Sequence, residues 1–203
     1  SADGREEPEE RTIQLIMRTS GGDFWSSIAM GAEAAVREYG VTMHVSAPDS
    51  EADVEGQLRK AMLSLDSNPD AIVLGANDDA AFAPFLEEAA KRGIPVVAID
   101  SLLTSGETAA YVGIDNYAAG QEAARKLAEL IGGEGEVAVV TSDTGGINGE
   151  LRERGIRDAL AEYPGIAAVE QRCAGDAADC RRKIGEMLEE KEVAGILALN
   201  TPS

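Results

Sequence analysis

Short apolar runs alternate with amphipathic segments along nearly the whole chain from Arg11 onward, and this alternation restricts the possible folds more than any other feature. Several of the runs are unbroken and rich in β-branched residues. Such runs suit a parallel sheet with helices on both faces, because neither face of the strand then meets water. The pattern therefore predicts an α/β fold of βαβ units. The expected strands are 12–17, 42–45, 71–74, 96–99, 111–113, 137–140, 167–171 and 195–199.

One interruption of this rhythm predicts two lobes. The segment between strands 96–99 and 111–113 is too short for a crossover helix and holds small polar residues around Gly106. We expect a hinge crossover at 101–110, an N-terminal α/β lobe at 11–100 and a C-terminal α/β lobe at 111–203, each a doubly wound parallel sheet. Residues 1–10 contain five acidic residues and no apolar periodicity, which predicts a disordered acidic tether.

The charge and the missing motifs exclude several classes of function. The chain has 37 acidic and 18 basic residues, a net charge of -19 that repels phosphate backbones, so nucleic acid is not an expected partner. No apolar run approaches the ~18 residues that span a bilayer, so we expect no membrane-spanning segment. The sequence contains no phosphate-binding loop, nucleophile elbow or zinc-protease motif, and its only histidine is His44. We therefore expect neither catalysis nor a cofactor.

The two cysteines, Cys173 and Cys180, lie at the end of an expected strand and in the first turns of the following helix. A short loop between them could bring the two sulfurs together. We predict a disulfide, with two ordinary buried thiols as the alternative. A zinc site is disfavoured, because His44 belongs to a different segment and no other soft ligand is near.

Polar residues follow the carboxyl ends of several expected strands, which is where doubly wound folds bind ligands. Arg18 follows the first strand and Asn77 the third, while Asp100 ends the fourth and Asn200 follows the last. A carboxylate at position 100 can accept two hydrogen bonds from hydroxyl groups, which a sugar offers. These positions predict a ligand site for a small polar molecule.

Two aromatic residues and one arginine add to the candidates. Phe24 and Trp25 open a helix in a chain with 4% aromatic residues. We expect one of them to pack in the core and the other to stack on the apolar face of a sugar ring. Arg154 lies near the start of a helix, where a positive charge opposes the helix dipole. It is either a ligand contact or a surface partner of a neighbouring glutamate.

At these residues the chain resembles the type I periplasmic binding proteins, close to the ribose-binding group, whose fold is shared by the effector domains of lactose-repressor-type regulators. The resemblance runs from Thr12 to Asn200. Ser101 stands where the family often has arginine, and Gly22 and Asp23 replace its usual Asn-Pro, so the resemblance does not identify the sugar. The segments that carry it are 19–25, 93–97 leading to Asp100, 112–116, 152–155 and 196–200.

The resemblance implies an exported, non-enzymatic solute-binding protein. It would bind a sugar-like ligand between two lobes and deliver it to the membrane permease of an ABC importer, with a possible lipid anchor at its N-terminus. The alternative is the effector domain of a repressor, although an acidic segment stands where a DNA-binding helix-turn-helix would be. Family members continue past Asn200, so we expect a fragment whose C-terminal lobe is incomplete. The resemblance implies that Phe24 and Trp25 clamp the ring, Asp100 and Arg154 hold hydroxyls from opposite lobes, Asn200 adds a polar contact, and Arg18 and Asn77 lie beside the pocket.

Overall fold

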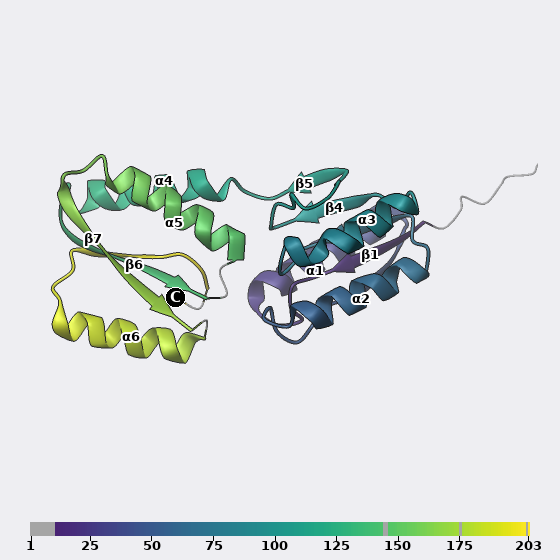
Figure 1. The fold of residues 1–203 in the computed structure, drawn as a ribbon, viewed down its shortest axis with the longest axis horizontal. Coiled ribbons are helices and arrows are strands. Elements are labelled where there is room, and N and C mark those ends of the chain that lie inside the picture. The colour runs from purple at the N-terminus through teal and green to yellow at the C-terminus, as the bar shows by residue number, and fades with distance from the viewer. Residues whose placement is uncertain (1–10, 144–145, 175, 202) are drawn as a thin grey trace, which may run out of the picture. The chain divides into compact units, whose positions relative to one another are not determined.

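The computed structural model describes residues 11–143, 146–174, 176–201 and 203. The chain divides into two compact units, Ser1–Gly113 (unit 1) and Ile114–Ser203 (unit 2). Each unit is a parallel β-sheet with helices packed on it (Figure 1), which confirms the predicted α/β class. The expected tether at 1–10 lies outside the described residues.

Unit 1 has a five-stranded sheet in the order β2-β1-β3-β4-β5, in which every neighbouring pair is parallel. The first residues of β1 pair with the first residues of its two neighbours, Thr12 with Thr42 in β2 and Ile13 with Ala71 in β3. The strands are β1 (Thr12–Ile16), β2 (Thr42–Ser46), β3 (Ala71–Leu74), β4 (Val96–Ile99) and β5 (Ala110–Val112), and the helices are α1 (Asp23–Tyr39), α2 (Val54–Asp66), the short 3₁₀ helix η1 (Ala80–Phe82) and α3 (Ala83–Lys91).

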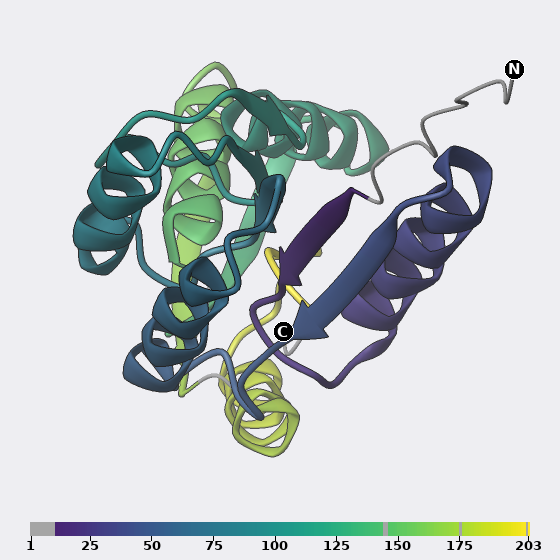
Figure 2. The same ribbon diagram turned by 90° about the vertical axis from the view of Figure 1, so that its right-hand side faces the viewer.

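The core of unit 1 is split by its sheet, because successive strand residues point to opposite faces. Ile16, Ile72 and Leu74 point to the face covered by α2 and α3, where they pack with Leu65 and Phe85. The other face is covered by α1 and holds a smaller cluster around Leu15, Met17 and Trp25. Figure 2 shows α1 on one side of the strands and the blue and teal helices α2 and α3 on the other. Burial on both faces accounts for the unbroken apolar runs.

Local signals in the sequence set the ends of several helices. The carboxylate of Asp53 accepts a hydrogen bond from the Gly56 backbone N–H at 2.9 Å at the start of α2. Asp115 and Asp176 cap two helices of unit 2 in the same way. Gly40 ends α1 with a left-handed backbone, φ 61°, which glycine adopts at little cost.

The boundary between the units differs from the predicted one. The strand expected to open the C-terminal lobe is β5, and it pairs with β4 in the sheet of unit 1, with Ala98 opposite Tyr111. The segment between β4 and β5 contains no helix, but it returns to the edge of the sheet where the strands begin, so that β5 runs parallel to β4. Hydrogen bonds from Thr104 and Ser105 to the Asp79 carboxylate hold this segment. Pairing with β5 satisfies backbone groups that β4 would otherwise expose at an edge. Unit 1 therefore extends to Gly113.

Unit 2 has a three-stranded parallel sheet in the order β7-β6-β8 among the described residues. Its larger core cluster joins α4 and α5 to the sheet through Ala124, Ile156, Leu160 and Val137. A smaller cluster joins α6 to the sheet around Val140. The elements are α4 (Asn116–Leu130), β6 (Glu134–Ser142), α5 (Gly146–Leu160), β7 (Gly165–Cys173), α6 (Ala177–Glu190) and β8 (Gly195–Ala198).

The predicted disulfide is not present, because Cys173 and Cys180 are both free thiols in the structure. The strand end does face the helix, as expected, and the two side chains pack together with Val140 and Ile184. Burial and the hydrogen bond between the two sulfurs raise the pKa of Cys173 to about 12. The apolar site therefore holds two neutral thiols, the alternative that the sequence left open.

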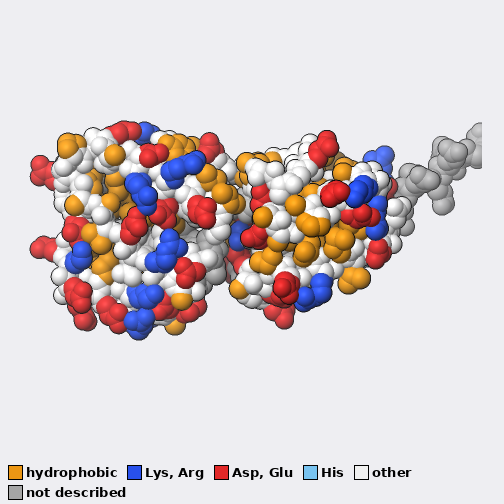
Figure 3. All heavy atoms as spheres, in the orientation of Figure 1, with side chains coloured by type: hydrophobic (Ala, Val, Ile, Leu, Met, Phe, Trp, Pro, Cys, Tyr) orange, Lys and Arg blue, Asp and Glu red, His pale blue; other side chains and the backbone are white. Residues whose placement is uncertain are grey.

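The surface mixes charges of both signs. Red acidic and blue basic side chains lie next to one another on the face seen in Figure 3. Many of them form ion pairs within one helix, such as Lys91 with Glu87 at 2.7 Å and Arg182 with Glu186 at 2.9 Å. None of the described helices combines the length and apolar character needed to cross a membrane.

Candidate functional site

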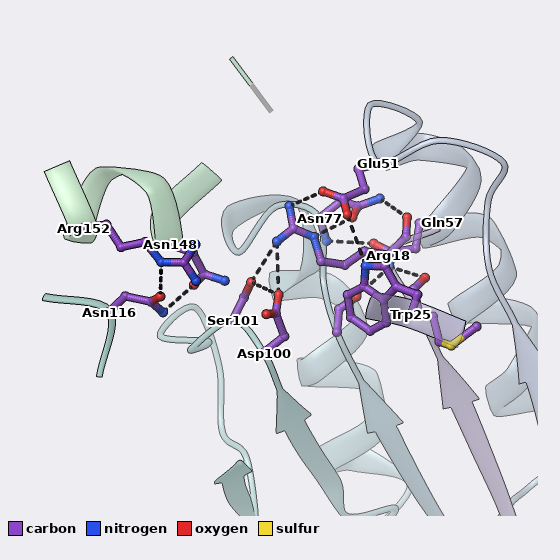
Figure 4. A network of polar contacts seen from close by, with 12 residues as sticks. Arg18, Trp25, Glu51, Gln57, Asn77, Asp100, Ser101, Asn116, Asn148 and Arg152 are labelled. Atoms are coloured by element: carbon purple, nitrogen blue, oxygen red, sulfur yellow. Dashed lines mark hydrogen bonds and ion pairs between the residues drawn. The ribbon is translucent and has the colours of Figure 1, made fainter. Parts of the chain in front are cut away.

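Arg18 is the centre of a polar cluster in unit 1. Its side chain lies just beyond β1, and the residue is only 7% exposed. One terminal nitrogen donates to the Asp100 carboxylate and to the Ser101 hydroxyl, both at 3.2 Å, and the other pairs with Glu51 at 3.0 Å. The Nε atom donates to the side-chain oxygen of Asn77 at 3.1 Å. We call these five residues the arginine cluster (Figure 4).

The parallel sheet explains why residues so distant in sequence meet here. Arg18 follows β1, Glu51 follows β2, Asn77 follows β3, and Asp100 and Ser101 follow β4. The carboxyl ends of parallel strands lie at one edge of the sheet, so every loop that leaves this edge can contribute to one site. The structure thus brings together Arg18, Asn77 and Asp100, three of the residues predicted from the sequence.

The charges of the cluster are unequal. A single guanidinium lies between two carboxylates, those of Asp100 and Glu51, so the cluster has one excess negative charge when all three groups are ionised. Burying such groups costs several kcal/mol per ion before their mutual attraction is counted, so an apolar packing would serve stability at least as well. The guanidinium of Arg18 is held by four contacts to the protein, so it keeps the two carboxylates in a fixed orientation. Carboxylates in this position can accept hydrogen bonds from hydroxyl groups.

Gln57 supports the cluster from α2 and was missed by sequence reasoning. Its side chain is fully buried, and its amide nitrogen donates to the carbonyls of Met17 at 2.9 Å and Gly75 at 2.7 Å. Its amide oxygen accepts from the Asn77 backbone N–H at 2.9 Å. These bonds tie the ends of β1 and β3 together. The sequence did contain a signal for Gln57, because this polar residue lies one helical turn before Ala61 and therefore on the apolar face of α2.

The two aromatic residues have different surroundings. Trp25 is 3% exposed and packs with Leu15 and Met17, and its indole N–H donates to Glu51 at 3.1 Å. Phe24 is 54% exposed and meets the Trp25 ring edge-on, with centroids 5.3 Å apart. Trp25 therefore fills the core and positions a carboxylate of the cluster. Phe24 is the more exposed of the two aromatic side chains and is the one on which a sugar could stack.

Unit 2 has a polar cluster of its own at the carboxyl end of its sheet. Asn116 and Asn148, both buried, join through a hydrogen bond of 3.1 Å between their side chains. Arg152 donates from Nε to Asn116 and from one terminal nitrogen to the Leu199 carbonyl, both at 2.7 Å. Leu199 directly follows β8. We call Asn116, Asn148 and Arg152 the amide cluster (Figure 4).

Arg154 lies apart from these contacts. It is exposed, and its guanidinium carbon lies over the Tyr117 ring at 5.1 Å from the centroid. The sequence singled out Arg154 as a candidate ligand contact, whereas it is Arg152 that lies in the amide cluster, and the spacing contained a signal for this position. Arg152 precedes the buried Ile156 by one helical turn and therefore shares its face of α5, whereas Arg154 does not.

Asn200 lies at the carboxyl edge of the unit 2 sheet, as the sequence predicted. Its side-chain nitrogen hydrogen bonds to the hydroxyl of Ser142, the last residue of β6, and its own side-chain and backbone oxygens accept from Ser203. It therefore joins the ends of β6 and β8. No group of His, Cys, Asp or Glu among the described residues is arranged to hold a metal ion.

Comparison with known families and sequences gives consistent matches. Residues 13–203 match the model of a family described as "Periplasmic binding protein domain". The chain is 27% identical over 163 residues to a D-apiose import binding protein of Actinobacillus succinogenes. The aligned region covers 80% of this chain and 52% of that protein. It is 26% identical to the D-allose-binding periplasmic protein of Escherichia coli, with 76% and 52% covered. The chain thus spans about half the length of these curated relatives.

A solved structure has a similar fold. A periplasmic solute-binding protein of an ABC transporter from Actinobacillus succinogenes, solved with bound D-allose, superposes with a TM-score of 0.89 at 30% sequence identity. The match covers 95% of this chain and 70% of that one. By their names these relatives bind sugars or were solved with a bound sugar, and none of them supports the repressor alternative.

Proposed function

The chain belongs to the periplasmic binding protein family, and on that premise we propose that it is the sugar-recognising part of an extracytoplasmic solute-binding protein. It binds a small neutral sugar or polyol, leaves it chemically unchanged and delivers it to the membrane permease of an ABC importer. The names of its relatives, which bind D-apiose and D-allose, support this proposal. An exported location follows from the same relationship.

The observation that carries the proposal is the arginine cluster. Asp100 and Glu51 supply four carboxylate oxygens at the edge where α/β sheets bind ligands, and one arginine holds both groups in place. Carboxylates accept hydrogen bonds from hydroxyl groups and repel other anions. The cluster therefore favours a neutral polyhydroxylated ligand over a sugar acid or a sugar phosphate. The exposed ring of Phe24, next to Trp25, can cover the apolar C–H face of such a ligand.

The amide cluster of unit 2 offers complementary chemistry. Arg152 supplies N–H donors, and Asn116 and Asn148 supply both donors and acceptors. We propose that these residues can also bind hydroxyl groups, with Arg152 in place of Arg154 as the charged donor of unit 2. Both clusters contain preoriented polar side chains at the carboxyl ends of parallel strands, so neither needs a large rearrangement to accept hydroxyl groups.

Calorimetry and thermal unfolding of the 203-residue chain test the proposal. D-Allose and D-apiose are compared with D-glucuronate, a sugar acid of similar size. We expect at least one neutral sugar to bind and raise the melting temperature, D-glucuronate to have no effect, and the bound sugar to be recovered unchanged. Preferred binding of D-glucuronate, or conversion of the sugar to a product, would contradict the proposal.

A further inference from the structure

Asp100 has an unusual backbone conformation. Its φ is +64°, and among the described residues only Asn68 shares a positive φ without being glycine. The Ser101 backbone N–H donates to the Ile99 carbonyl at 2.7 Å, which closes a three-residue turn around Asp100. A turn of this size with positive φ at its centre is the rare, strained form of the γ-turn. Such strain persists only where neighbouring groups enforce it.

Two groups of β5 enforce this turn. The Asp100 backbone N–H donates to the Val112 carbonyl at 3.1 Å, and the Asp100 carbonyl accepts from the Tyr111 hydroxyl at 3.0 Å. The Tyr111 ring is half-buried and packs against the larger core cluster of unit 1. The hydroxyl is therefore anchored by the core and reaches the strained peptide from a fixed position.

Gly113 provides the space that this hydroxyl occupies. A Cβ atom at position 113 would lie 2.1 Å from the Tyr111 hydroxyl oxygen and 2.4 Å from the adjoining ring carbon. Atoms at these distances overlap, so an alanine would push the end of the tyrosine side chain away. The φ of Gly113 lies outside the left-handed region, so alanine adds no backbone strain there.

We propose that Tyr111 is a positioning residue for the arginine cluster. Its hydroxyl holds Asp100 in the strained turn that directs the carboxylate to the Arg18 guanidinium, and Gly113 permits that contact. Without the hydroxyl, the backbone of Asp100 relaxes and the ion pair with Arg18, 3.2 Å in the structure, loses its fixed geometry. The consequence for sugar binding rests on the proposed function, whereas the consequence for the ligand-free cluster does not.

Nuclear magnetic resonance of the ligand-free chain tests the positioning role directly. Tyr111→Phe removes only the hydroxyl, and Gly113→Ala displaces it while keeping the tyrosine. We expect both variants to shift the backbone amide signals of Asp100 and Ser101 and the Nε–H signal of Arg18, in the same direction. The melting temperature, measured in parallel, separates this local change from a general loss of stability.

Two control variants make the same chemical changes elsewhere in unit 1. Tyr39→Phe alters a tyrosine that is 73% exposed, and Gly31→Ala adds a Cβ that meets no atom within 4 Å. These controls should leave the three signals in place. If Tyr111→Phe and Gly113→Ala move the signals no more than the controls do, Tyr111 does not position Asp100 and the proposal is wrong.

Calorimetry with D-allose then tests the effect on binding. Loss of one hydrogen bond that orients Asp100 should weaken D-allose binding about three- to tenfold in Tyr111→Phe and in Gly113→Ala. In an Asp100→Ala background the same changes should have no further effect, because Tyr111 acts through Asp100. An equal loss of affinity in both backgrounds would overturn the proposal. If the unaltered chain binds neither D-allose nor D-apiose, the proposed function fails, and the ligand-free signals still decide the role of Tyr111.

Discussion

Arg152 and Arg154 show how two similar residues acquire different roles in one helix. Successive residues in a helix are rotated by about 100°, so these side chains leave α5 in directions about 200° apart. Arg152 contacts Asn116 and the Leu199 carbonyl, whereas Arg154 lies over Tyr117. We expect Arg152→Ala to weaken D-allose binding about ten- to a hundredfold, the cost of one charge-assisted hydrogen bond. Arg154→Ala should change the affinity less than about threefold.

Titration calorimetry of both arginine variants measures the difference. Arg154→Ala is the matched control, since it removes the same side chain from the same helix. A larger loss of affinity in Arg154→Ala than in Arg152→Ala would restore the assignment that the sequence first suggested.

Cys173 predicts a dependence of stability on alkaline pH. Burial and the hydrogen bond to Cys180 raise the pKa of this thiol in the folded chain to about 12, whereas an unfolded thiol has a pKa of about 8.5. Below the unfolded value both states are protonated, and the stabilisation is fully present. As the pH rises from about 8.5 toward 12, the unfolded chain loses the proton and the folded chain keeps it, so the free energy of unfolding decreases.

Urea unfolding at pH 8 and pH 10 checks this expectation. The decrease should be smaller in Cys173→Ala, which lacks the thiol, and iodoacetamide should label the folded chain slowly at pH 8. Equal decreases in both proteins, or rapid labelling of Cys173 in the folded chain, would contradict the assigned pKa.

At the scale of elements, two glycines set the distance between α4 and α5. A Cβ at Gly120 would lie 2.2 Å from the Arg152 carbonyl oxygen, and a Cβ at Gly155 would lie 2.1 Å from the Tyr117 carbonyl oxygen. At each glycine, the backbone of one helix therefore lies in close contact with the backbone of the other helix. This close approach also places Arg152 of α5 beside Asn116 of α4. The two glycines therefore determine both the packing of the helices and the geometry of the amide cluster.

We expect Gly120→Ala and Gly155→Ala to destabilise the chain by about 1–3 kcal/mol each, because backbone atoms cannot move aside as a side chain can. Gly149→Ala, in α5 like Gly155, is the control, since its Cβ would meet no atom within 4 Å. That variant should be neutral or stabilising by up to about 1 kcal/mol, the difference in helix propensity. Urea unfolding gives the three values, and equal effects at the three positions would show that α4 and α5 can separate freely.

At the scale of the whole molecule, each unit has cores of its own. Leu74 packs in the larger cluster of unit 1, and Leu160 packs in the larger cluster of unit 2. We expect Leu74→Ala and Leu160→Ala each to lower the stability of its own unit by about 2–5 kcal/mol, through lost burial and the cavity left behind. Native-state hydrogen exchange should show lower protection mainly in the altered unit. A uniform loss across both units would show that the chain unfolds as one cooperative body.

The sequence by itself determined the class of fold and the edge of the sheet that carries the polar residues. Apolar runs that alternate with helical periods are local patterns, and parallel strands place their carboxyl ends together whatever the details of packing. Arg18, Asn77 and Asp100 could therefore be selected from their positions after strands, and the structure joins them in one cluster. The same reasoning placed Asn200 at the corresponding edge of unit 2.

Only the tertiary structure decided which neighbour each residue meets. It paired β5 with β4, kept Cys173 and Cys180 as thiols, and buried Trp25 while leaving Phe24 exposed. It also revealed the strained turn at Asp100 and the contact from Tyr111 that holds it. These outcomes depend on contacts between segments far apart in sequence or on the direction of one side chain. Local periodicity carries no information about them, because several long-range arrangements satisfy the same apolar pattern.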